Sequence, residues 1–120
     1  MKLAIVGSRN FNDYKKFKKH ILEVVCLWEL DLSDLTIISG GAKGADSLAG
    51  EFATDFDIPI KIYSANWKKY GKAAGVLRNS QIINEATHVV AFPSVTGKGT
   101  QDSIKKAKER EIPCEYFYID

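Results

Sequence analysis

Short apolar runs alternate with helical patterns along the whole chain. Most runs are rich in Val, Ile or aromatic residues, which is typical of buried strands. The five runs are Leu3–Val6, Leu35–Ile38, Ile58–Tyr63, His88–Phe92 and Cys114–Ile119. Between them, apolar residues recur three or four positions apart, as in Phe17, Ile21 and Val25, and this spacing predicts amphipathic helices. The predicted helices span Tyr14–Leu30, Ala45–Phe56, Lys72–Glu85 and Thr100–Glu111.

The alternation of strand and helix predicts parallel strands joined by crossover helices. Near-continuous apolar strands such as Val89–Phe92 fit a sheet that helices cover on both faces. We expect an α/β protein with a five-stranded, mainly parallel sheet of order 3-2-1-4-5, in one domain over residues 1–120. The segment Ser64–Gly71 is long for a connection, so we expect an irregular loop that lines a site.

Polar, glycine-containing segments follow the first, second and fourth predicted strands. They are Gly7–Asn10, Ser39–Asp46 and Pro93–Thr100. Because the carboxyl ends of parallel strands meet at one edge of a sheet, Gly7, Gly40 and Gly97 should lie together there. Glycines let the backbone approach an anion, and free N–H groups at helix starts stabilise its charge. A tight turn would explain any one of these loops, but three at one edge favour an anion site.

Standard phosphate-binding motifs are absent. SGGAKGAD at Ser39–Asp46 does not fit the P-loop pattern, and neither this segment nor Gly7–Asn10 contains GxGxxG. We therefore expect neither an ordinary P-loop NTPase nor an ordinary dinucleotide dehydrogenase. The 17 Lys and Arg residues against 15 Asp and Glu residues give a net charge of +2, which by itself favours no class of partner.

Metal, redox and membrane functions find no support in the sequence. Cys26 and Cys114 form no CxxC pair, and we expect both to be reduced and to act as small hydrophobic residues. His20 and His88 have no Cys or carboxylate at ligand spacing, so we expect no metal and no cofactor. No apolar run approaches the roughly 18 residues that cross a bilayer. The start at Met1 does not resemble a signal peptide, so we expect a cytoplasmic protein with no membrane partner.

Four motifs together resemble a known family. GSRxF at Gly7–Phe11, SGGAKGAD at Ser39–Asp46, ANWKKYGKAAGVLRN at Ala65–Asn79 and GKGTQDSI at Gly97–Ile104 are similar to the YspA branch of the SLOG superfamily, which also includes the Smf/DprA proteins and the LOG enzymes. The resemblance implies a Rossmann-like, three-layer α/β/α fold and a site for a nucleotide or nucleotide-derived ligand. Members of the superfamily variously sense nucleotide ligands, hydrolyse nucleotides or bind single-stranded DNA.

The resemblance also implies individual site residues. Those that match the glycine-rich loop are Ser39, Gly40, Gly41, Gly44 and Asp46, with Lys43 where Arg is common. Those that match the GxGT with which LOG enzymes hold phosphate are Gly97, Gly99 and Thr100. The glutamate that LOG enzymes place three residues after this threonine is Ser103 here, and Asp102 precedes it. One step along a helix turns a side chain by about 100°, so we expect no LOG-type cleavage.

Charged and hydroxyl side chains complete the predicted site. Arg9 and Arg78 are two of only three arginines, and each would clamp a phosphate or else remain a surface side chain. Asp46 would orient a ribose hydroxyl or cap its helix, Ser8 would donate to phosphate, and Thr100 would both donate and cap. Asn79 follows Arg78 and joins the predicted ligand-binding set.

Aromatic residues alternate with lysines at Trp67–Lys72. Trp67 and Tyr70 would stack on a base while the lysines contact phosphates, or else they cover the sheet edge. The lysines at Lys15–Lys19 are interpreted as a solvated helix face.

Three functions remain open at this point. The leading hypothesis is a domain that binds a nucleotide or a related phosphorylated ribose compound as a sensor or accessory protein. The second is a nucleotide N-glycosidase-like hydrolase of the LOG type, and the third is a single-stranded nucleic-acid binder of the DprA type. Self-association through an exposed aromatic residue such as Trp28 is a further expectation.

Overall fold

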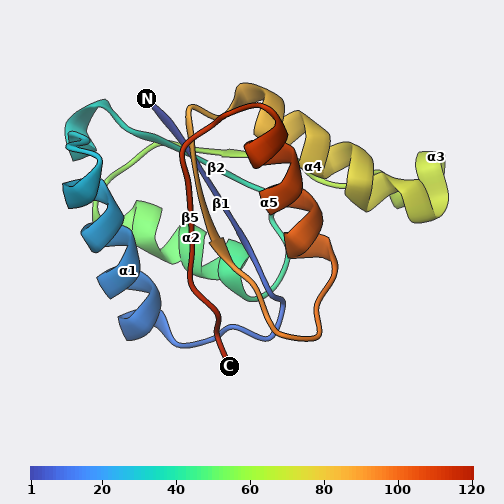
Figure 1. Ribbon diagram of the computed structural model, residues 1–120, viewed down its shortest axis with the longest axis horizontal. Coiled ribbons are helices and arrows are strands. Elements are labelled where there is room, and N and C mark those ends of the chain that lie inside the picture. Colours follow the sequence, from blue (N-terminus) through green and yellow to red (C-terminus); the bar gives the residue numbers. More distant parts are fainter.

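The computed structural model describes residues 1–120 as a parallel sheet flanked by helices (Figure 1). The strands are β1 (Lys2–Gly7), β2 (Thr36–Ser39), β3 (Ile60–Ile62), β4 (His88–Phe92) and β5 (Cys114–Tyr116). The α-helices are α1 (Tyr14–Leu27), α2 (Ala45–Asp55), α3 (Trp67–Tyr70), α4 (Ala74–Glu85) and α5 (Gly99–Glu109), and two short 3-10 helices, η1 (Leu32–Asp34) and η2 (Gly71–Ala73), complete the elements.

The sheet has the order β3-β2-β1-β4-β5, and every neighbouring pair is parallel. This confirms the predicted strand order and the Rossmann-like α/β class. β1 is central and pairs with β4 over its length, from Leu3 opposite His88 to Gly7 opposite Phe92. All five strands therefore end at the same edge of the sheet, where a ligand site is expected in this architecture.

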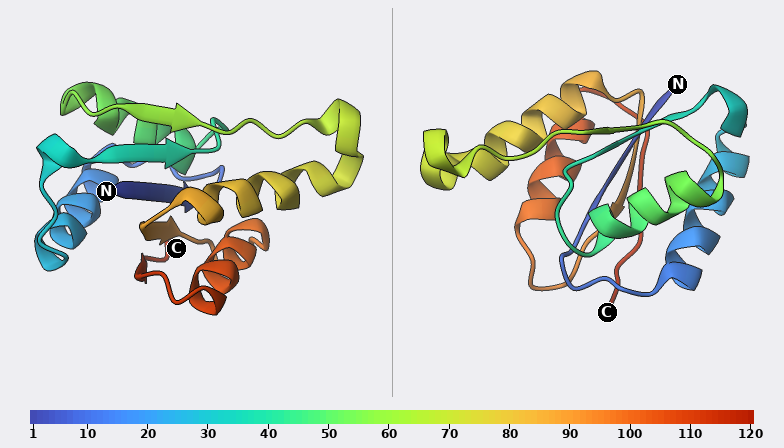
Figure 2. Two further views of the ribbon diagram at one scale, coloured as in Figure 1. Left: turned by 90° about the horizontal axis from the view of Figure 1, so that it is seen from above. Right: turned by 180° about the vertical axis from the view of Figure 1, so that it is seen from behind.

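Successive residues of the central strand enter two separate cores. Leu3 and Ile5 of β1 join a cluster with residues of α1 and α2, including Phe17 and Phe52. Ala4 and Val6 join a second cluster with Ile82 and Ile83 of α4 and with Ile104 and Ala107 of α5. Figure 1 and the rear view in Figure 2 accordingly show α1 and α2 on one side of the strands and α4 and α5 on the other. This alternation is the period of a strand buried on both faces.

The segment predicted to be an irregular loop is mostly helical. After β3 the chain extends away from the sheet, forms α3 and η2, and returns as α4. The segment between β3 and α4, residues 63–73, is called the arm, and α3 lies at its tip (Figure 2). The Asn66 side chain caps α3 by accepting a hydrogen bond from the Lys69 N–H at 3.1 Å. The prediction of a helix from Lys72 was therefore wrong at its start, because α4 proper begins at Ala74.

Several predicted side-chain environments also differ from the structure. Cys26 is exposed, so it does not act as a buried hydrophobic residue. Trp28 is half-buried, packs against the core and has its ring centroid 5.0 Å from that of His88, so it is not the exposed aromatic residue that the expected self-association assumed. No helix is long and apolar enough to cross a membrane.

Candidate functional site

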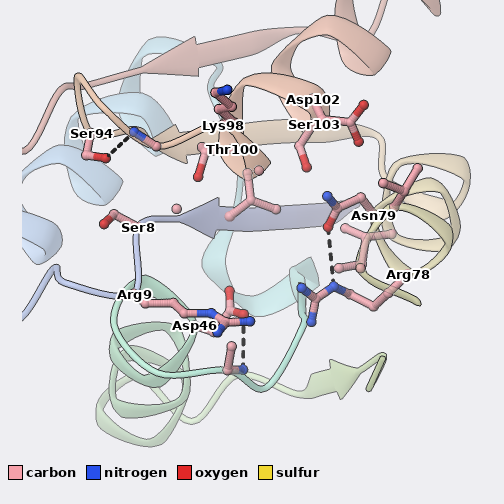
Figure 3. A pocket seen from close by; sticks show the side chains of 18 of the residues that line it. Ser8, Arg9, Asp46, Arg78, Asn79, Ser94, Lys98, Thr100, Asp102 and Ser103 are labelled. Atoms are coloured by element: carbon pink, nitrogen blue, oxygen red, sulfur yellow. Dashed lines mark hydrogen bonds between the residues drawn. The ribbon is translucent and has the colours of Figure 1, made fainter. Parts of the chain in front are cut away.

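A cavity of about 610 Å³ opens at the carboxyl edge of the sheet (Figure 3). β1 ends at Gly7, Gly40 follows β2, and Gly97 follows β4, so the prediction that these glycines lie at one edge is confirmed. The predicted site residues that line the cavity are Gly7, Ser8, Arg9, Asp46, Trp67, Arg78, Asn79, Gly97, Gly99 and Thr100. The cavity lies within the range of about 300–1,000 Å³ that is usual for small-molecule sites.

Ser8 joins the first two loops and the end of β4. Its N–H donates to the Phe92 carbonyl at 2.9 Å, and its own carbonyl accepts from the Ala45 N–H at 3.1 Å. The Ser8 hydroxyl oxygen accepts from the Asn10 N–H at 3.1 Å, which leaves the hydroxyl proton free to donate into the cavity. The wall around Ser8 is therefore fixed by backbone hydrogen bonds.

Glycine at position 44 permits the close contact between these loops. A Cβ atom there would lie 2.2 Å from the Ser8 carbonyl oxygen, and Gly44 has φ +74°, which disfavours other residues. Gly44 is also the N-cap of α2, and it provides no side chain for capping. The glycine-rich segment thus packs against the first loop, and Gly44 does not itself line the cavity.

Arg78 of α4 reaches across to the second loop. Its Nη1 donates to the Gly40 carbonyl at 3.1 Å, and its Nε donates to the Asn79 side-chain oxygen at 3.3 Å. The guanidinium is half-buried, and Nη2 makes no hydrogen bond within the chain. Two hydrogen bonds therefore hold the Arg78 guanidinium in position, and its Nη2 group remains free to donate to a ligand.

Asp46 faces the same part of the cavity as Arg78. Its Oδ2 accepts from the Ala42 N–H at 3.1 Å. Burial raises the pKa of Asp46 above its usual value, while the Ala42 N–H and the nearby Arg78 guanidinium oppose this rise. Figure 3 shows the Arg9 side chain extended toward Asp46. Asp46 lies in the first turn of α2, but the N-cap position belongs to Gly44.

The opposite wall is formed by the loop after β4 and the first turn of α5. Ser94 is buried, and its hydroxyl accepts from the Gly97 N–H at 2.9 Å. The N-cap of α5 is Lys98, without a side-chain hydrogen bond, so the predicted capping by Thr100 was wrong. The N–H groups of Gly99 and Thr100 have no partner within the helix, and both residues line the cavity. A helix start of this kind attracts anions.

The carboxylates that line the cavity are already engaged. Lys106 donates to the Asp102 carboxylate at 2.8 Å and to the Val76 carbonyl at 3.1 Å. Ser103 is buried and lines the cavity, but it has no neighbouring base in the hydrogen-bond network. Asp102 is therefore paired with Lys106, whereas Asp46 is fixed through Oδ2 by the Ala42 N–H and keeps Oδ1 for a ligand.

Some predicted site residues lie outside the cavity, and others were missed. Those outside it are Ser39, Gly40, Gly41, Lys43, Gly44 and Tyr70, which shape the second loop or the arm. The lining residues that the sequence did not single out include Asn10, Ser94, Thr96 and Lys98, whereas Lys72 belongs to the predicted Trp67–Lys72 stretch. Lys98 stands inside the GKGT motif, and its position at a helix start was the signal that could have identified it.

The fold and the site define a Rossmann-like protein with an anion-favouring cavity at the carboxyl edge of its sheet. Residues 1–70 match the YspA, cpYpsA-related SLOG family, and the chain belongs to this family. The Gene 61 protein of Mycobacterium phage D29 is 34% identical over 89 residues, which cover 69% of this chain and 71% of that protein.

Solved structures share the fold at low sequence identity. DNA processing protein A from Streptococcus pneumoniae superposes with a TM-score of 0.72 at 20% identity, over 98% of this chain and 49% of that one. DNA processing protein A from Helicobacter pylori, whose structure is described for its single-stranded DNA binding mode, gives a TM-score of 0.66 at 20% identity over 97% of this chain and 64% of that one. The protein TM1055 gives 0.65 at 16% identity over 94% and 71%. The chain thus spans about half the length of the Streptococcus protein and under two thirds of the Helicobacter protein.

Proposed function

We propose that the cavity binds a nucleotide or a nucleotide derivative, a phosphorylated ribose compound, in a sensor or accessory role. The observation that carries this proposal is the pair of unsatisfied donor groups that face one cavity. These are the first turn of α5 and the guanidinium of Arg78. Fixed donors of this kind bind a phosphate without reorganising, which favours affinity.

The remaining lining residues suit the other parts of such a ligand. Trp67 at the mouth offers a ring for stacking against a base. Asp46 offers a carboxylate oxygen to ribose hydroxyl groups, and Arg9, Lys72 and Lys98 add positive charge. We propose binding without cleavage, because Ser103 stands where LOG enzymes place their glutamate and the adjacent Asp102 is paired with Lys106.

Calorimetric titration with adenosine monophosphate (AMP) tests this proposal. Arg78→Ala should weaken AMP binding by roughly tenfold to a hundredfold, the scale of about 1.5–3 kcal/mol for a hydrogen bond to a charged group. Arg110→Ala is the matched control, because Arg110 is an exposed arginine at the far end of α5 and should leave the affinity unchanged. Equal affinities of the wild type and Arg78→Ala, with both proteins folded by circular dichroism, would remove Arg78 from the site.

A second candidate, single-stranded nucleic-acid binding, is favoured by the arm. Trp67 and Tyr70 are 52% and 45% exposed there. Lys68, Lys69 and Lys72 are exposed beside them and form no ion pair. No carboxylate occurs between Ile58 and Asn84, so the arm presents positive charge and flat rings together.

Fluorescence anisotropy of a labelled oligothymidine across a salt series tests this candidate. The logarithm of the affinity should fall linearly with the logarithm of salt concentration, and Lys69→Ala should reduce the slope by about 1. Lys15→Ala on α1 serves as the control for loss of one charge. Binding that survives high salt, or that Lys15→Ala weakens as much as Lys69→Ala does, would argue against the arm as a nucleic-acid surface.

A further inference from the structure

The wall of the cavity between β4 and α5 has few anchors of its own. The turn is closed by Gly97, whose N–H donates to the hydroxyl and to the carbonyl of Ser94 at 2.9 and 3.3 Å. The Val95 side chain is 72% exposed and contributes nothing to the core. Two glycines, Gly97 and Gly99, add backbone freedom next to the helix start. The loop between β4 and α5 therefore needs a contact with another part of the chain to keep one conformation.

Residues Phe117–Asp120, the 117–120 segment, provide that contact. Beyond β5 the chain continues beside β4: the Phe117 N–H donates to the Ala91 carbonyl at 2.9 Å, and the Ile119 N–H donates to the Pro93 carbonyl at 3.0 Å. The Asp120 carboxylate then accepts from the Val95 N–H at 3.0 Å. Figure 1 shows this end of the chain beside the loop between β4 and α5.

The segment is itself fixed to the body of the protein. The Phe117 ring stacks on the His20 ring of α1 with a centroid distance of 4.0 Å and an interplanar angle of 15°. Phe117 and Ile119 both pack against the core cluster on the α1 side. At the other wall, the Gln101 side-chain amide donates to the Tyr118 hydroxyl at 3.3 Å. The segment therefore links α1 to the first turns of α5.

We propose that the 117–120 segment is a positioning element of the ligand site and that Asp120 is its positioning residue. Through Val95, the Asp120 carboxylate sets the loop that presents the N–H groups of Gly99 and Thr100 to the cavity. The backbone between Val95 and Gly99 makes hydrogen bonds within the loop and within α5. The Asp120 carboxylate is its one hydrogen-bond partner from elsewhere in the chain. An ionised carboxylate is a strong acceptor of a backbone N–H, so the one hydrogen bond from Val95 to Asp120 is able to hold the loop. The binding part of this inference rests on the nucleotide site proposed above.

Two substitutions at one position separate the hydrogen bond from the charge. Asp120→Ala removes the acceptor and should weaken AMP binding about tenfold, the effect of losing one hydrogen bond to a charged acceptor. Asp120→Asn keeps an acceptor oxygen and removes only the negative charge. Its AMP affinity should equal or exceed that of the wild type. Glu109→Ala, which removes an exposed carboxylate at the far end of α5, is the control.

Amide hydrogen exchange without any nucleotide gives a second, independent readout. The Val95 and Gly97 amides should exchange about tenfold faster in Asp120→Ala than in the wild type, while the β4 amides keep their protection. Unchanged exchange at these amides in Asp120→Ala, or an AMP affinity of Asp120→Asn as low as that of Asp120→Ala, overturns the inference. If the wild type binds no AMP but the loop exchange depends on Asp120, the nucleotide proposal fails and the positioning of the loop stands.

Discussion

At the scale of single residues, the site depends on positions where a side chain cannot fit. Gly44 lies against the Ser8 carbonyl with a positive φ, and a Cβ at Gly40 would meet the Arg78 guanidinium at 2.6 Å. These contacts bring the first loop, the second loop and Arg78 of α4 together on one side of the cavity. The glycines of the second loop therefore shape the site by close packing. Their direct contact with a ligand, which the family resemblance implies, stays a prediction.

Two glycine-to-alanine substitutions should change stability in opposite directions. Gly44→Ala should lower the free energy of unfolding by more than about 1 kcal/mol, since alanine is strained at positive φ and would collide with Ser8. Gly50→Ala should raise it by about 0.5–1 kcal/mol, because Gly50 lies within α2 and its Cβ would meet nothing within 4 Å. Urea unfolding measures both values. A Gly44→Ala protein as stable as the wild type would contradict the described packing of the two loops.

Side-chain partners explain which residue predictions succeeded. Arg9 and Arg78 could be selected because arginines are scarce in this chain, Arg9 stands in the first predicted loop and Arg78 belongs to a motif of the family resemblance. The ion pair of Asp102 with Lys106 could also be predicted from the sequence, since Lys106 follows Asp102 at the helical spacing of four residues. The packing of Trp28 against His88 could not be predicted from the sequence, because His88 lies in a strand 60 residues later.

At the scale of elements, Glu85 joins the end of α4 to two strands. Its carboxylate accepts hydrogen bonds from the Tyr63 hydroxyl, from Lys2 of β1 at 3.0 Å and from Lys61 of β3 at 3.1 Å. These contacts, with Tyr63 the largest contributor, lower the pKa of Glu85 from 4.5 to about 2. Glu85 thereby attaches the edge strand β3 and the base of the arm to the centre of the sheet.

This network predicts a specific loss of stability in acid. Because the pKa of Glu85 is lower in the folded than in the unfolded chain, its contribution is complete above pH 4.5 and is lost as the pH falls toward 2. Glu85→Gln should therefore be less stable than the wild type at pH 7, and the difference should shrink between pH 4.5 and 2. Urea unfolding at each pH measures this, with Glu109→Gln as the control. A difference between Glu85→Gln and wild type that is constant over this pH range would contradict the assignment.

Element order could be predicted far better than element boundaries. The alternation of apolar runs and helical stripes specified the sheet order, because crossover connections leave few alternatives. The segment that contains α3 was predicted as a loop, because the four residues of α3 are too few to show helical periodicity. In the structure α3 ends at Gly71, which has φ +56°. The last strand was predicted to reach Ile119 but ends at Tyr116. Its partner β4 ends at Phe92, and Phe117 and Ile119 run on beside Ala91 and Pro93.

At the scale of the whole molecule, a small net charge hides a strong separation of charge. Lys43 is the one Lys or Arg between His20 and Ile60, whereas the arm region between Ile58 and Asn84 contains no carboxylate. Figure 2 shows this arm extending from the edge where the strands end. Trp67 and Lys72 of the arm line the cavity. An anionic ligand would therefore approach the cavity from its positively charged side.

The central claim is that the three loops at the carboxyl edge form one nucleotide site. The most direct test is a two-dimensional amide NMR titration of isotope-labelled protein with AMP. Shifts should cluster at three segments, Gly7–Asn10, Ala42–Asp46 and Gly97–Thr100, and at Arg78 of α4, with no adenine released into solution. Shifts confined to α3, shifts scattered over the surface, or no shifts at these three segments would contradict it.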